Sequence, residues 1–255
     1  MTALNSKGEY KYELSEGINL VQGLNAKAFV VRTDRNGLWE KSLVIQFPEL
    51  RRVLSTKEGF VNAMVAVNHS AHPELWEKIS QEMKTDEGKV YLQVIKEKIA
   101  KTGTAADMDN LAIATKEYKP FIVTALVTAG AKTNALRTGV DKGIYIEGEE
   151  SKGTVNIFIL TNAKLTDGAM SRAIITITEA KTAAFDDLKT PSSYTQNVQA
   201  TGTGTDSVIV ISGTTGSVVT YTGGHSRIGE LIGKAVYEAV IEALGKQNGF
   251  KMIKH

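Results

Sequence analysis

The chain has 255 residues, 42% of them hydrophobic, and its 30 Lys and Arg against 28 Asp and Glu leave a net charge of +2. This composition is too apolar for a disordered chain, and the small net charge without a basic block argues against a nucleic-acid partner. There is no cysteine, which excludes disulfides, zinc–thiolate sites and cysteine nucleophiles. No signal-peptide core and no run of roughly 18 apolar residues occurs, so we expect no membrane partner and a cytoplasmic location.

Strands are predicted along most of the chain. Asn36-Gly37 separates two β-rich segments, which is the strongest short signal for a hairpin. The continuous apolar run at 121–128 predicts a central strand buried on both faces. The full set of predicted strands is 28–32, 38–47, 60–67, 111–115, 121–128, 154–162 and 208–211.

Helices are predicted at 73–83, 89–101, 167–188 and 228–244. The last is the most regular, with Ser226 as its N-cap and Gly245 at its end. Hairpins, then helices, then long strands alternating with long helices predict an α+β fold. We expect a single domain over 1–255, with a central mixed β-sheet flanked by helices and a long amphipathic C-terminal helix.

The stretch 201–207, Thr-Gly-Thr-Gly-Thr-Asp-Ser, is the first candidate for a binding site. Glycine lets a backbone approach a ligand closely, and each threonine hydroxyl both donates and accepts hydrogen bonds. The same alternation also occurs in ordinary turns, and the Lys-Ser/Thr of a phosphate-binding P-loop is missing. Both interpretations are open at this point. The candidate residues are Gly202, Thr203, Gly204, Thr205, Asp206 and Ser207.

His225 is a candidate general base. It stands next to the predicted N-cap Ser226, and the N-terminus of a helix favours the neutral, proton-accepting imidazole. The alternative is that His225 only shapes the start of the helix. The polar connector at 189–200, which precedes the 201–207 stretch, is predicted to be a mobile flap.

Four polar loops, at 128–139, 161–168, 201–207 and 221–226, follow or precede buried elements. Their side chains suit a ligand rich in amides better than a charged phosphate. Asn156 lies inside a predicted buried strand and therefore needs a partner, either another loop or a ligand. The further substrate-binding candidates are Asn68, Asn134, Asn156, Asn162 and Gly224.

Charged residues elsewhere give weaker signals. His69 and His72 are three residues apart beside Glu74, but no HExxH pattern accompanies them, and we predict no metal site there. Glu179 and Lys181 lie on the predicted helix 167–188, where charged side chains are usually solvated or paired. We expect the same of these two.

Several blocks in the same order resemble the adenosylcobinamide amidohydrolase family, strongly over about 105–245. The resemblance rests on blocks at 128–139 (TAGAKTNALRTG), 153–157 (GTVNI), 165–170 (LTDGAM), 179–184 (EAKTAA), 200–206 (ATGTGTD) and 221–233. It implies a hydrolase that cleaves the amide joining the propionyl side chain of a corrin ring to aminopropanol. The implied substrate is adenosylcobinamide or a related corrinoid, with no cofactor, and the product is adenosylcobyric acid for cobalamin salvage.

Amide hydrolysis needs a nucleophile, donors for the oxyanion and an acid for the leaving amine. Our hypothesis has His225 as base, oriented by Asp206 or Asp167, activating water or the hydroxyl of Thr205 or Ser207. Backbone amides of 202–206, with Asn134 or Asn162, would hold the oxyanion. The alternatives are a corrinoid-binding protein without hydrolytic activity and a nucleotide-binding module, and the sequence leaves a homo-oligomer open.

Overall fold

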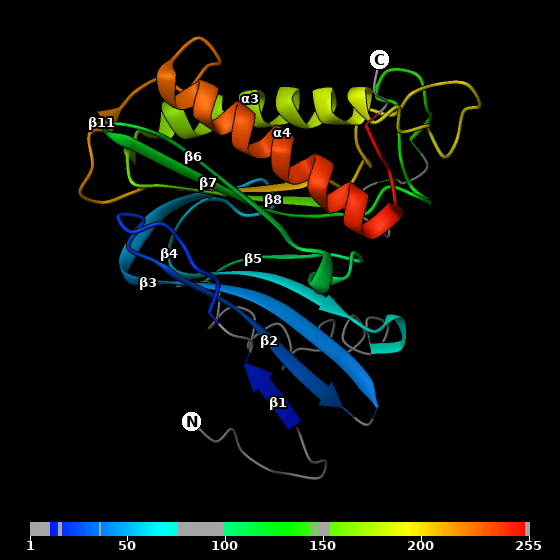
Figure 1. The fold of residues 1–255 in the computed structure, drawn as a ribbon, viewed down its shortest axis with the longest axis horizontal. Helices are drawn as coiled ribbons and strands as arrows, with labels where there is room; N and C mark the ends of the chain where they lie inside the picture. The colour runs from blue at the N-terminus through cyan, green and yellow to red at the C-terminus, as the bar shows by residue number, and fades with distance from the viewer. Residues whose placement is uncertain are drawn as a thin grey trace.

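The computed structural model describes residues 11–14, 17–35, 37–75, 99–143, 146 and 154–252. Within them the chain forms one mixed nine-stranded sheet covered by two long helices (Figure 1). The single-domain α+β fold predicted from the sequence is confirmed.

The N-terminal strands pair mainly with their neighbours in sequence. They are β1 (Lys11–Leu14), β2 (Lys27–Arg35), β3 (Leu38–Ser55), β4 (Gly59–Ala71) and β5 (Ile99–Gly103). The first four are successively antiparallel, and β5 runs parallel to β4. The hairpin around Gly37 is confirmed, whereas Asn36 lies outside the described residues. Strand β3 continues past Pro48 because its pairing with β4 shifts register between Gln46 and Arg51, and such a shift accommodates a proline.

The second half of the sheet consists of β6 (Ala112–Tyr118), β7 (Phe121–Ala129), β8 (Val155–Thr161) and β10 (Ser207–Ile211). Strands β6, β7 and β8 are antiparallel in order, and β10 is parallel to β8. The other edge of β10 pairs with the end of β3, which joins the two halves. A short 3₁₀ helix η1 (Met108–Asn110) precedes β6, and β9 (Lys164–Leu165) pairs separately with β11 (Val218–Val219).

Both long helices begin at capping side chains. Thr166 accepts from the Ala169 amide at the start of α3 (Asp167–Asp187), and Ser226 accepts from the Gly229 amide at the start of α4 (Arg227–Asn248). Helix α4 runs beyond Gly245 and ends at Gly249, whose φ of +75° is the left-handed conformation of a C-terminal cap. In the described part of the chain, no helix combines the length and apolarity needed to span a membrane.

One helix prediction is wrong at its end. Residues 99–101 belong to β5, in which buried and half-buried side chains alternate as in a strand. The rest of that prediction and most of the predicted helix at 73–83 lie outside the described residues.

The elements stack in three layers, with α3 and α4 above β6–β8 and β10, and β2–β5 below them (Figure 1). Alternate residues of β8 enter two different cores. Ile157 packs with the helices, and Phe158 packs with the lower strands. Strand β7 is fully buried from Val123 to Ala129, as predicted for a central strand.

The part of the sheet that lies between the two cores, made of β6–β8 and β10, has two distinct ends. Strands β8 and β10 are parallel and start at the same end, where Asp206 directly precedes β10. We call this the Asp206 end. Helices α3 and α4 begin at the opposite end, beside β11, and His225 precedes α4 there (Figure 1). We call this the His225 end.

Candidate functional site

The structure separates the predicted site residues into two groups. The Asp206 end holds Asn68, Asn134, Asn156, Gly202, Thr203, Gly204, Thr205, Asp206 and Ser207, and the His225 end holds Asn162, Asp167, Gly224 and His225. The hypothesis in which Asp206 orients His225 required both in one place. This arrangement is not formed, because a full strand length separates the start of β10 from the loop that leads into α4.

The loop 201–206 lies against the loop that follows β7. The Gly202 carbonyl accepts from the Leu136 amide at 2.8 Å, and the Thr201 amide donates to the Leu136 carbonyl at 2.9 Å. Gly204 has a φ of +74°, which favours glycine. A Cβ on Gly202 would collide with the Asp206 carboxylate and the Lys181 ammonium. The glycines are therefore required by the shape of the loop.

Asp206 is the centre of this loop's hydrogen bonds. Its Oδ1 accepts from the Thr203 hydroxyl at 2.5 Å and from the Thr203 amide at 3.2 Å. The Val155 amide donates to the same oxygen at 3.3 Å, and Oδ2 forms an ion pair with Lys181. The carboxylate thus connects the loop, the start of β8 and helix α3.

Lys181 was expected to be solvated or paired, and it is paired and 8% exposed. It is a member of the site that sequence reasoning passed over. The signal was its position, four residues after Ile177 and three before Ala184, on the stripe of α3 that otherwise carries apolar residues. A lysine at such a position implies a buried partner.

A second polar cluster lies between the sheet layers, next to the loop. The buried Asn156 amide donates to Asn68 Oδ1 and to the Gly103 carbonyl, both at 2.8 Å. Asn68 in turn donates to Thr128 Oγ1 at 2.8 Å. Of the two options for Asn156, the structure therefore provides the protein partner, and an unpaired amide would have cost about 1–3 kcal/mol.

Thr154 connects this cluster to the loop. Its hydroxyl lies 2.6 Å from the Thr205 carbonyl oxygen and 3.0 Å from Asn156 Oδ1. Thr154 and Thr128 were not predicted to be site residues, although Thr154 begins a predicted strand and Thr128 ends one. Threonine at a strand terminus is too common a pattern to mark a site.

The remaining residues of the Asp206 end are also held in place. Asn134 is 4% exposed in the loop after β7, and the Ser207 hydroxyl lies 3.3 Å from that of Thr56. The predicted flap is tied to the Asn134 loop, because the Ser193 amide donates to the Ala135 carbonyl and the Ala135 amide donates to the Ser193 hydroxyl. These bonds oppose the mobility expected from the sequence.

Asp141 provides a further tie between the same loops. It accepts from the Arg137 amide at 2.6 Å, from the Ser192 hydroxyl at 2.7 Å and from the Thr195 hydroxyl. The hydrogen bond from Thr195, followed by those from Arg137 and Ser192, lowers the pKa of the Asp141 carboxyl. Asp141 thereby holds the loop that follows β7 against the 189–200 connector.

The His225 end is organised differently. The Asp167 carboxylate accepts from Arg52 through both oxygens, at 2.8 and 3.0 Å, and this hydrogen bonding lowers its pKa. Asn162 accepts from the Ile122 amide and donates to the Pro120 carbonyl, both at 2.8 Å. Gly224 and His225 are exposed. Two of the four candidates at this end are thus occupied by protein partners.

The histidines discussed as metal ligands have other partners. His69 Nδ1 lies 2.8 Å from the Ser42 hydroxyl, and burial lowers the pKa of this imidazole. His72 accepts from the Glu74 amide and packs edge-on against Trp39. In the described ranges, no group of three or more His, Asp or Glu side chains is arranged to hold a metal ion.

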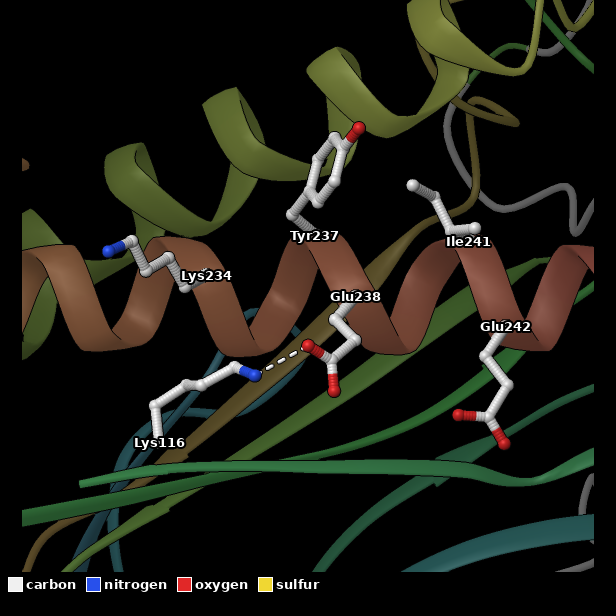
Figure 2. A pocket seen from close by; sticks show the side chains of 6 residues that line it. All are labelled: Lys116, Lys234, Tyr237, Glu238, Ile241 and Glu242. Atoms are coloured by element: carbon white, nitrogen blue, oxygen red, sulfur yellow. Dashed lines mark hydrogen bonds and ion pairs between the residues drawn. The ribbon is translucent and has the colours of Figure 1, made fainter. Parts of the chain in front are cut away.

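A shallow groove of about 410 Å³ lies along α4 beside β6, away from the predicted site residues (Figure 2). Its charged groups have partners, with Lys116 bound to Glu238 and Lys234 bound to Glu230. The Tyr237 hydroxyl donates to Asp187, and this hydrogen bond raises the tyrosine pKa to about 12. The charged side chains of the groove are therefore engaged by protein partners.

The architecture is that of a single-domain α+β protein in which a buried polar cluster closes one end of the sheet. The adenosylcobinamide amidohydrolase family model matches residues 27–252. The chain belongs to this family, which confirms the resemblance seen in the sequence.

Two curated relatives are similar over different lengths. An uncharacterized protein of Methanocaldococcus jannaschii is 48% identical over 228 residues, covering 83% of this chain and 89% of the relative. An adenosylcobinamide amidohydrolase of Methanosarcina mazei is 29% identical over 146 residues, covering 54% of this chain and 62% of that protein.

Two solved structures are more distant, each with 13% identity. The PH0078 protein of Pyrococcus horikoshii has a TM-score of 0.43 over 94% of this chain and 84% of that one. A β-aminopeptidase of a Burkholderia species has a TM-score of 0.41 over 80% of this chain and 78% of that one.

Proposed function

We propose that the protein hydrolyses adenosylcobinamide, cleaving the amide between the propionyl side chain of the corrin ring and aminopropanol. Water adds across the C–N bond, giving the carboxylate of adenosylcobyric acid and the free amine. Membership of the family supports the reaction class. The observation that carries the proposal is the polar cluster at the Asp206 end, where the loop 201–206 meets Thr154 and Lys181.

The loop offers hydroxyl and amide groups to a substrate rather than a free carboxylate, because Asp206 already accepts from several protein donors. The half-exposed Thr205 has its hydroxyl 3.3 Å from that of Thr203, which donates to Asp206. In our proposal a proton leaves the attacking water, or the Thr205 hydroxyl itself, along this path to the carboxylate and returns from there to the nitrogen of the leaving amine. The oxyanion is placed at backbone amides of the same turn.

The sequence predicts that His225 is a general base, and this prediction has yet to be tested. His225 is exposed and precedes α4, which begins at the other end of the sheet (Figure 1), so a base acting at the loop must be supplied by the Asp206 end itself. The two assignments require different variants to lose activity, and they are therefore separable.

The decisive experiment incubates the purified protein with adenosylcobinamide and measures free aminopropanol together with adenosylcobyric acid. We expect multiple turnovers. Tight corrinoid binding without release of aminopropanol would contradict the proposal and favour the alternative, a corrinoid-binding protein. Binding of ATP or GTP without corrinoid binding would favour the nucleotide-binding module. A parallel reaction with EDTA tests the metal-free mechanism, which loss of activity restored by a divalent cation would overturn.

A further inference from the structure

The ion pair between Lys181 and Asp206 directly supports the backbone of the candidate catalytic loop. A side chain on Gly202 would overlap both charged groups, so the ion pair lies in contact with the loop backbone at this residue. The Gly202 carbonyl is fixed from the other side by the Leu136 amide at 2.8 Å. The loop is thus held between the ion pair and the Leu136 segment.

Both charged side chains are largely removed from water. The Lys181 side chain is 10% exposed and that of Asp206 is 16% exposed. Removing one partner from such a pair leaves an uncompensated buried charge, whereas apolar residues of similar volume can replace a whole pair with little loss of stability. Packing alone therefore does not explain why Lys181, on the otherwise apolar stripe of α3, forms an ion pair with Asp206.

Lys181 holds one oxygen of the carboxylate, and Thr203 holds the other. The Thr203 hydroxyl and amide both donate to Oδ1, at 2.5 and 3.2 Å. Because the carboxylate is planar and rigid, fixing Oδ2 from helix α3 also fixes the direction in which Oδ1 points. Helix α3 thereby sets the orientation of Thr203 and of the adjacent Thr205.

We infer that Lys181 is a positioning residue for amide hydrolysis, which acts through Asp206 to hold the 201–206 loop in its productive conformation. The inference rests on the proposed function of this loop. A misplacement of about 1 Å at a catalytic group can cost roughly 100-fold in rate. Loss of Lys181 should accordingly reduce kcat more than it weakens corrinoid binding.

The test compares Lys181→Met with Lys181→Arg, using Lys234→Met as a matched control. Lys234 also forms an ion pair on a helix, but its side chain is 63% exposed and lies outside the proposed site. For Lys181→Met we expect kcat to fall by about 100-fold, with KM and the corrinoid Kd changed by less than about threefold. Lys181→Arg should recover at least about tenfold in kcat because it keeps the positive charge.

A second measurement follows the loop without substrate. Hydrogen exchange of the Thr203 amide, which donates to Asp206, should be at least about tenfold faster in Lys181→Met than in the wild type. Exchange of the Gly229 amide, bound to Ser226 at the other end of the sheet, should be unchanged. This measurement tests positioning even if the wild type proves not to hydrolyse adenosylcobinamide, an outcome that would contradict only the proposed function.

The inference is overturned if folded Lys181→Met keeps kcat within about threefold of the wild type, or if kcat falls only in proportion to the folded fraction. It is also overturned if the exchange of the Thr203 amide is unaltered. Should Lys181→Met not fold, the isosteric Asp206→Asn carries the same expectations for kcat and for the Thr203 amide. If Asp206→Asn kept both the wild-type kcat and the wild-type exchange rate of the Thr203 amide, the inference would be rejected.

Discussion

The two ends of the sheet carry similar kinds of residues and use them differently. At the Asp206 end, asparagine, threonine, lysine and aspartate side chains are mostly buried and bind one another across segments far apart in sequence. At the His225 end, polar groups are more exposed and mainly cap helices or turns. Burial accounts for the difference, because a buried polar group must find a partner and so fixes its neighbours.

The largest expected difference between the two ends is in turnover. Asp206→Asn should lower kcat on adenosylcobinamide by at least about 100-fold, since it weakens both the ion pair and the path for the proton. His225→Ala should stay within about threefold of the wild type. Steady-state release of aminopropanol measures both. A severe loss in His225→Ala, with full activity in Asp206→Asn, would reverse our assignment of the site.

A pair of glycine substitutions compares the ends through stability. Gly202→Ala introduces a Cβ into the Lys181–Asp206 pair and should cost about 1–3 kcal/mol, as overpacking does. Gly224→Ala at the other end has open space around its Cβ and should change stability by less than about 0.5 kcal/mol. Urea denaturation gives both values. Equal losses of stability in the two variants would show that the 201–206 loop can shift to accommodate a Cβ at residue 202.

A pair of asparagine substitutions tests the buried cluster. Asn156→Ala leaves Asn68 Oδ1 and the Gly103 carbonyl without their donor, and we expect a loss of about 1–3 kcal/mol. The half-buried Asn162 makes two bonds, both to backbone groups near the surface, whereas Asn156 also accepts from the buried Thr154 hydroxyl, so Asn162→Ala should cost less. Chemical denaturation of the two variants measures both losses of stability. A larger loss for Asn162→Ala than for Asn156→Ala would contradict this prediction.

The smallest expected effect is on the pH dependence of stability. Hydrogen bonds from Thr195, Arg137 and Ser192 lower the pKa of Asp141 from its ordinary value of 3.8. A carboxyl with a lowered pKa in the folded state contributes stability that is present above its unfolded pKa and is lost as pH falls through the folded pKa. Between pH 5 and 2 (roughly the range spanning both values), the unfolding midpoint of Asp141→Asn should therefore fall less steeply than that of the wild type. Identical slopes would mean that Asp141 does not stabilise the loops.

Much of the local structure was readable from the sequence. The cap at Ser226 and the hairpin near Gly37 depend on nearest neighbours and were predicted correctly. The need of Asn156 for a partner followed from its place in a buried strand. Gly245 misled because αL geometry, rather than the presence of a glycine, ends a helix, and the residue with that geometry is Gly249.

The choice of which polar loops meet was decided by the tertiary structure. Strand β10 lies between β3 and β8, and this order places Asp206 beside Val155 and Lys181, a full strand length from His225. Periodicity and capping act over a few residues and identify each loop as polar, but they carry no information about strand order. The sequence by itself thus determined the family, both long helices, most of the long strands and the 201–207 candidate, and only the long-range pairing of strands showed that Lys181, and not His225, is the partner of Asp206.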